Sequence, residues 1–98
     1  MAKRKVIWSL QSQNNRIQIL EYWIERNKSK EYSIKLNNLF KEAAEFISEF
    51  PTVGKPTDEK DARIKIVRDY LIVYEYTKST VTILAIFDSR QDPVKLKY

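Results

Sequence analysis

The pattern of apolar and polar positions begins with a short β-type stretch and continues with a helical one. Residues 3–8 are rich in β-branched and aromatic side chains and are followed by polar residues, so they predict a first strand. From about Asn14 onward, apolar residues recur at helical spacing up to Ile24. Ser9 or Ser12 would supply the N-cap of this first helix.

A second helical pattern, the clearest in the chain, spans residues 31–50. Its apolar residues follow the i, i+3, i+4, i+7 rule from Leu36 to Phe50, while lysines and glutamates fill the other positions. The break at residues 27–29 is short, and Ser29 would cap the helix that follows. Two helices joined this closely must run antiparallel as a hairpin.

Beyond the second helix, the period of the pattern shortens from 3.6 to 2. Residues 51–56 begin with proline and contain the only glycine of the chain, so they predict a turn-rich loop. Arg63 and Lys65 then alternate with apolar residues, which puts both cations on one face of a strand. Residues 70–76 alternate in the same way. Residues 81–87 are apolar on both faces, as expected of a central strand.

This order of elements predicts an α+β fold. We expect an N-terminal strand, an α-helical hairpin and then a three-strand antiparallel meander, with the helices packed on one face of the sheet. A chain of 98 residues has room for one domain, so we expect residues 1–98 to form a single one.

Composition removes several kinds of chemistry. The chain has no cysteine and no histidine, which excludes disulfides, thiolate nucleophiles and the commonest metal ligands, so we expect neither a metal nor a cofactor. No apolar run approaches the roughly 20 residues of a spanning helix, and we expect no membrane association. The basic N-terminus lacks the apolar core of a signal peptide, so the expected location is the cytoplasm.

The net charge of +5 is unevenly distributed along the chain. Residues 1–30 carry seven Lys and Arg against two Glu, residues 31–61 carry four against seven acids, and residues 62–98 carry seven against four. A compact protein with this distribution is expected to have one cationic face, suited to phosphates or to an acidic protein segment. A solvated basic surface without such a role is the alternative.

Three local motifs occur in order along the second half of the chain. They are a Pro-x-x-Gly turn from Pro51 to Gly54, a Tyr-x-Ile-Val-Tyr strand at residues 70–74 and Arg-Gln-Asp-Pro at residues 90–93. With the predicted elements, they make nearly the whole chain resemble the toxins of the RelE/ParE superfamily. The resemblance implies a toxin of a type II toxin–antitoxin pair, whose partner is a cognate antitoxin protein.

The RelE-like branch of this superfamily cuts messenger RNA on the ribosome without a metal ion. By resemblance, Lys65, Arg90 and Tyr98 would be the catalytic residues, and Arg63 and Arg68 would bind RNA phosphate. Cleavage by 2′-hydroxyl attack needs a base, an acid and positive charge at the phosphorus. A lysine crowded by arginines gives up its proton more readily, so Lys65 would be the base.

Two other functions remain open. ParE-like members inhibit DNA gyrase and are not known as nucleases, and a degenerate member would only bind its antitoxin. We favour RNA cleavage because Arg63, Lys65, Arg68 and Arg90 would converge on one face, opposite the helical hairpin. The alternative for Arg63 and Lys65 is the solvated face of an edge strand.

Overall fold

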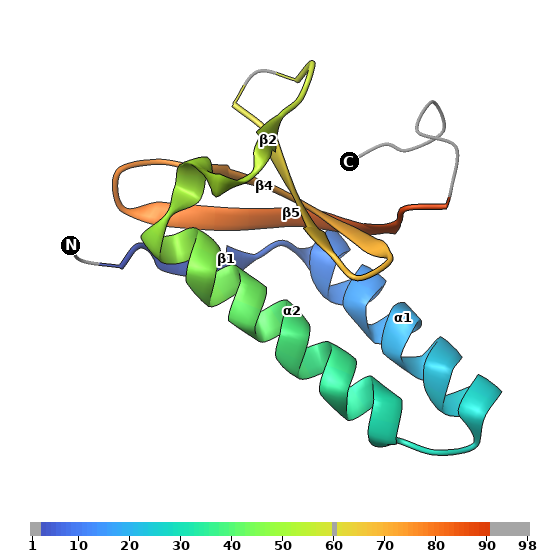
Figure 1. Ribbon diagram of the computed structural model, residues 1–98. Helices are drawn as coiled ribbons and strands as arrows, with labels where there is room; N and C mark the ends of the chain where they lie inside the picture. Colours follow the sequence, from blue (N-terminus) through green and yellow to red (C-terminus); the bar gives the residue numbers. More distant parts are fainter. Residues whose placement is uncertain (1–2, 60, 91–98) are drawn as a thin grey trace.

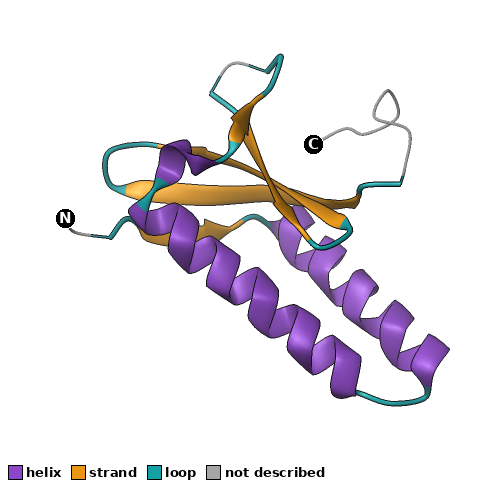
Figure 2. Ribbon diagram, in the orientation of Figure 1, coloured by secondary structure: helices purple, strands orange, loops and turns teal. Residues whose placement is uncertain are grey.

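The protein forms a mixed five-stranded sheet with two antiparallel helices against one face (Figure 1). The computed structural model describes residues 3–59 and 61–90. Figure 2 shows the two layers, with the helices on one side of the strands. The elements in chain order are β1 (Lys5–Trp8), α1 (Leu10–Asn27), α2 (Glu31–Glu49), a 3₁₀ turn (Pro51–Val53), β2 (Lys55–Pro56), β3 (Arg63–Val67), β4 (Tyr70–Tyr76) and β5 (Thr80–Asp88).

The helix termini explain where the hairpin begins and turns. Ser9 is the N-cap of α1, and its Oγ accepts a hydrogen bond from the Ser12 N–H at 3.0 Å. The first helix therefore starts four residues earlier than the expected Asn14. Lys28 ends α1 in the left-handed conformation with φ of 53°. The N-cap of α2 is Lys30 and not the expected Ser29, although Ser29 Oγ, one residue earlier, accepts from the Glu31 N–H at 3.2 Å.

The strand order is β1-β5-β4-β3-β2. The strands β3, β4 and β5 form the expected antiparallel meander, and β5 lies in the interior of the sheet as its two apolar faces predicted. The first strand pairs with β5 in parallel, so the sheet is mixed. The two-residue β2, which the sequence pattern does not predict, pairs with β3 at the opposite edge.

The main core lies between α2 and the centre of the sheet. Leu36, Phe40 and Ile47 of α2 are fully buried and belong to one cluster with Ile72 and Ile83 of the sheet. This burial confirms the helical stripe that the sequence showed. The other sheet face carries a smaller buried cluster of three residues, Ala62, Val73 and Ala85.

The described part of the chain contains no helix that is long and apolar enough to cross a membrane.

Candidate functional site

Arg63 and Lys65 lie on the face of β3 that the helices cover. In the β3–β4 register Arg63 is opposite Tyr74 and Lys65 is opposite Ile72, and both partners belong to the core beneath the helices. The expectation that the hairpin packs on the opposite face from these cations is wrong. Period-2 alternation shows that Arg63 and Lys65 share one face of β3. It does not show whether that face or the one carrying Ile64 is covered by the helices.

Backbone carbonyls hold the Arg63 guanidinium. Its Nη1 donates to the Gly54 carbonyl at 2.7 Å and to the Thr52 carbonyl at 3.3 Å. These bonds tie β3 to the segment that follows α2. These hydrogen bonds give the Arg63 guanidinium a structural role in this position.

A buried tyrosine of β4, Tyr74, also binds the segment that follows α2. The Tyr74 hydroxyl donates to the Pro51 carbonyl at 2.6 Å and accepts from the Gly54 N–H at 2.9 Å. A Cβ on Gly54 would lie 2.5 Å from the Tyr74 hydroxyl oxygen and 2.9 Å from the Ile64 carbonyl oxygen. The Pro-x-x-Gly motif and the second tyrosine of Tyr-x-Ile-Val-Tyr therefore form one structural unit.

Lys65 contacts an aromatic ring. Its Nζ lies 5.8 Å from the centre of the Phe46 ring, which belongs to α2. Arg63 is two residues away on the same strand face, and it points its guanidinium to the Gly54 carbonyl. The Lys65 side chain therefore extends from β3 to the edge of α2.

Arg68 and Arg90 lie at the other end of the sheet. Arg68 is exposed in the β3–β4 turn, where it adopts a left-handed φ of 57°. Asp69 of the same turn accepts, through its carbonyl, the Ser89 N–H at 2.7 Å, which brings the turn beside the end of β5. The two arginines are thus near each other in the fold and far along the strands from Arg63.

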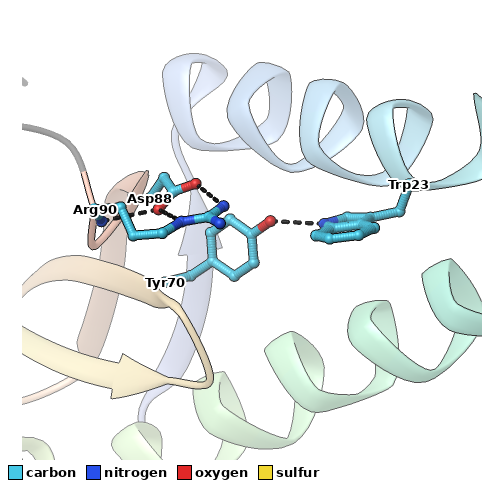
Figure 3. Close-up of polar contacts among 4 residues, drawn as sticks. All are labelled: Trp23, Tyr70, Asp88 and Arg90. Atoms are coloured by element: carbon cyan, nitrogen blue, oxygen red, sulfur yellow. Dashed lines mark hydrogen bonds and ion pairs between the residues drawn. The ribbon is translucent and has the colours of Figure 1, made fainter. Parts of the chain in front are cut away.

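Arg90 forms a bidentate ion pair with Asp88 (Figure 3). Its Nε donates to Asp88 Oδ1 at 2.9 Å and its Nη2 to Oδ2 at 2.6 Å. The hydrogen bond from Arg90 lowers the pKa of the Asp88 carboxyl, and in turn Asp88 raises the pKa of Arg90. Both groups stay ionised at neutral pH, and their charges compensate each other.

Tyr70 lies beside this ion pair and is hydrogen-bonded to α1 (Figure 3). Its hydroxyl accepts a hydrogen bond from Trp23 Nε1 at 2.7 Å, and the residue is only 4% exposed. Burial raises the pKa of Tyr70, so the hydroxyl keeps its proton at neutral pH. The two tyrosines of the strand motif are therefore both anchored in the core, Tyr70 at the start of β4 and Tyr74 within it.

The predicted catalytic groups do not meet in the described structure. Lys65 lies beside Phe46 of α2, Arg90 is paired with Asp88 just beyond the end of β5, and the phosphate-binding candidate Arg63 is bound to carbonyls. Tyr98 lies outside the described residues. Among residues 3–59 and 61–90, no three His, Cys, Asp or Glu side chains gather as metal ligands.

The structure reveals a groove that the sequence did not indicate. It lies between α1 and the end of β5 and has a volume of about 520 Å³. Its lining includes Asn15, Gln18 and Tyr22 from α1, together with Tyr70 and the Asp88–Arg90 pair. From the sequence, these α1 residues are expected on the solvent-exposed side of the helix. Only their position next to β5 in the structure shows that they line a groove.

Comparison with known proteins identifies the family. The family model described as "ParE toxin of type II toxin-antitoxin system, parDE" matches residues 6–93. The chain belongs to this family. It is therefore a type II toxin–antitoxin toxin of the RelE/ParE superfamily, as the sequence motifs predicted. No curated protein matches the chain.

A solved structure supports the fold. The chain is similar to a protein of the "Chromosomal ParDE TA system from P. aeruginosa", with a TM-score of 0.77 and 12% sequence identity. The match covers 88% of this chain and 96% of the other. At this identity the likeness concerns the ParE-like fold alone.

Proposed function

We propose that this ParE-family toxin arrests growth by inhibiting DNA gyrase, without cutting RNA. Membership of the ParE family supports the proposal, because the gyrase inhibitors of the superfamily are its ParE-like members. The observation that carries the proposal concerns three of the predicted site cations, the catalytic candidates Lys65 and Arg90 and the phosphate-binding candidate Arg63: each contacts another group of the chain. Arg63 is bound to carbonyls, Lys65 lies over Phe46 and Arg90 is paired with Asp88.

RNA cleavage would require these groups to act together on one phosphate. Transition-state stabilisation needs donors that already point at the site where negative charge develops. Arg63 and Arg90 instead direct donors to acceptors of the chain, and they lie at opposite ends of the sheet. A phosphate would have to displace these acceptors and would still reach only one of the two arginines.

The partner that we propose is a cognate antitoxin, in keeping with the family. Several large apolar side chains of the described surface are substantially exposed, among them Leu10, Ile17 and Ile66. Burial of such side chains, at roughly 25 cal/mol per Å² of apolar surface, would provide binding energy for a protein that covers them.

Induced expression tests the target directly. Primer extension on translated messages is run beside gel analysis of plasmid supercoiling, for the wild type and for Lys65→Ala and Arg90→Ala. We expect intact messages, a plasmid that becomes relaxed or broken, and growth arrest that persists in Lys65→Ala. Codon-phased cuts that disappear in both variants would instead establish the RelE-like nuclease. Induction that leaves growth, messages and plasmid unchanged would identify a non-toxic antitoxin-binding module.

A further inference from the structure

The turn between β3 and β4 has a backbone conformation that its first residue does not favour. Only Arg68 and Asp69 lie between Val67 and Tyr70, which are register partners and close the hairpin. Two-residue hairpin turns need a positive φ at the first central residue, where glycine, asparagine or aspartate is usual. Here that residue is Arg68, with φ of 57°. The fold alone would favour glycine, because a Cβ makes this conformation strained.

The two residues that follow Arg68 are both anchored. The Asp69 carbonyl accepts the Ser89 N–H at 2.7 Å, which ties the turn to the end of β5. Tyr70 is buried, and its hydroxyl accepts a hydrogen bond from Trp23 of α1. The backbone at Arg68 is therefore held by its neighbours. A partner that binds there meets a preorganised residue and loses less conformational entropy on binding.

The Arg68 side chain has no structural contact that would offset this strain. It is exposed, and within residues 3–59 and 61–90 its guanidinium has no hydrogen bond, ion pair or ring contact. The neighbouring Asp69 interacts with Arg90, which also binds Asp88. Of the predicted site cations in the described ranges, Arg68 is thus the one that keeps its charge free for a partner.

The surroundings of Arg68 favour a single carboxylate over a nucleic acid. Asp69 and Asp88 accompany Arg68 and Arg90 at this end of the sheet, so two negative formal charges cancel two positive ones. A polyanion gains no net attraction from such a surface. One guanidinium can still bind one carboxylate through two parallel N–H···O bonds, and arginine is enriched among the residues that dominate protein–protein binding. A protein with an exposed acidic side chain therefore fits.

We infer that Arg68 is the residue with which the toxin binds DNA gyrase, its guanidinium holding an acidic side chain of that enzyme. The strained turn presents this guanidinium from a fixed backbone at the tip of the β3–β4 hairpin (Figure 1). The inference rests on the proposed gyrase inhibition. It adds which residue of the toxin makes the contact and which kind of group it binds.

Replacement of Arg68 by glycine separates a binding role from a structural one. Glycine removes the guanidinium and relieves the strained φ, so binding should weaken while stability does not. We expect the urea midpoint of Arg68→Gly to equal or exceed that of the wild type. The dissociation constant for purified gyrase, measured without DNA by surface plasmon resonance, should rise at least about tenfold. The toxin concentration that half-inhibits supercoiling should rise by a similar factor.

Lys28→Gly is the matched control. Lys28 ends α1 with a φ of 53°, close to that of Arg68, and its Nζ is bonded to Glu25 at 2.6 Å. Glycine there relieves a similar strain but removes a charge that is already compensated. We expect gyrase binding and inhibition to stay within about twofold of the wild type. Arg68→Lys keeps the charge without the two parallel bonds, so its loss of binding should be smaller than that of Arg68→Gly.

Some outcomes concern the gyrase proposal and others concern Arg68 alone. A wild-type toxin that neither binds nor inhibits gyrase overturns both. Wild-type inhibition that Arg68→Gly retains overturns the role of Arg68 and leaves the gyrase proposal standing. Equal losses in Arg68→Gly and Lys28→Gly overturn it as well, because the backbone change is then the cause. A urea midpoint that falls by more than about 0.3 M in Arg68→Gly shows a structural role instead.

Two further measurements exclude other partners of Arg68. Unchanged binding of Arg68→Gly to DNA-free gyrase, with inhibition lost, would assign the guanidinium to the DNA that gyrase holds and overturn the carboxylate. Binding of the purified antitoxin is measured for the same variant, and we expect it to stay within about twofold of the wild type. Weaker antitoxin binding with unchanged gyrase binding would place Arg68 in the antitoxin interface and overturn the inference.

Discussion

Replacement of Tyr74 by phenylalanine tests the structural unit that joins β4 to the turn after α2. The residue is completely buried, and its hydroxyl is bonded to the Pro51 carbonyl and the Gly54 N–H, both in buried residues. Tyr74→Phe keeps the ring and leaves two buried backbone groups without a partner. Each unsatisfied group costs about 1–3 kcal/mol, so for two groups we expect the free energy of unfolding to fall by about 2–6 kcal/mol.

Urea denaturation followed by circular dichroism measures this change. With an m-value of about 1.5 kcal/mol per molar urea, a loss of about 3 kcal/mol lowers the midpoint by about 2 M. Tyr76→Phe is the matched control on the same strand, because the described residues give its hydroxyl no hydrogen bond, while its ring packs against the core and faces the Arg4 guanidinium. We expect the control to stay within about 0.5 kcal/mol of the wild type. Equal stability of the two variants would refute the reasoning.

Three further predictions follow from the same contacts. Gly54→Ala should lower the free energy of unfolding by about 1–3 kcal/mol or more in urea denaturation, because the new Cβ clashes with the Tyr74 hydroxyl and a carbonyl oxygen; unchanged stability would contradict the clash. Burial raises the pKa of Tyr70 and Tyr74, so their contribution to stability is complete below the ordinary tyrosine pKa and is lost as the pH rises through the raised values. The urea midpoint should therefore fall above about pH 10, less steeply in Tyr74→Phe, and parallel curves for the two proteins would be inconsistent with this. Arg90→Met should raise the lowered pKa of Asp88 toward its ordinary range in a carboxyl NMR titration, because the side-chain hydrogen bonds, the largest cause, are lost and only the hydrogen bond from the residue 90 N–H remains; a pKa that does not rise would mean that the side chain is not the cause.

The order and type of the elements could be predicted because each has a strong periodic signal. The α2 stripe contains Leu36, Phe40 and Ile47 at helical spacing, and the structure buries all three. The two apolar faces of β5 predicted its interior place in the sheet. The parallel pairing of β1 could not be read in the same way, because a four-residue strand carries no sign of its direction relative to a partner far along the chain.

The candidate site was harder to predict because alternation leaves the choice of face open. Arg63 and Lys65 share a face as expected, yet that face is the one beneath the helices, where Gly54 and Phe46 supply their partners. The pairing of Arg90 with Asp88 spans only two residues, but the sequence offers no way to tell a local ion pair from a free arginine. The groove beside β5 depends on where β1 stops, which is a property of the register.

The most direct test of the proposed function is a supercoiling assay with purified DNA gyrase, relaxed plasmid and the purified toxin. The proposal predicts that the toxin blocks ATP-dependent supercoiling in a dose-dependent manner, and that prior addition of the antitoxin restores it. Under the proposal Lys65→Ala should inhibit as the wild type does, because gyrase inhibition requires no catalytic base and Lys65 contacts Phe46 of its own chain. Full gyrase activity at a large excess of a toxin preparation that arrests growth and cuts ribosome-bound messages would contradict the proposal.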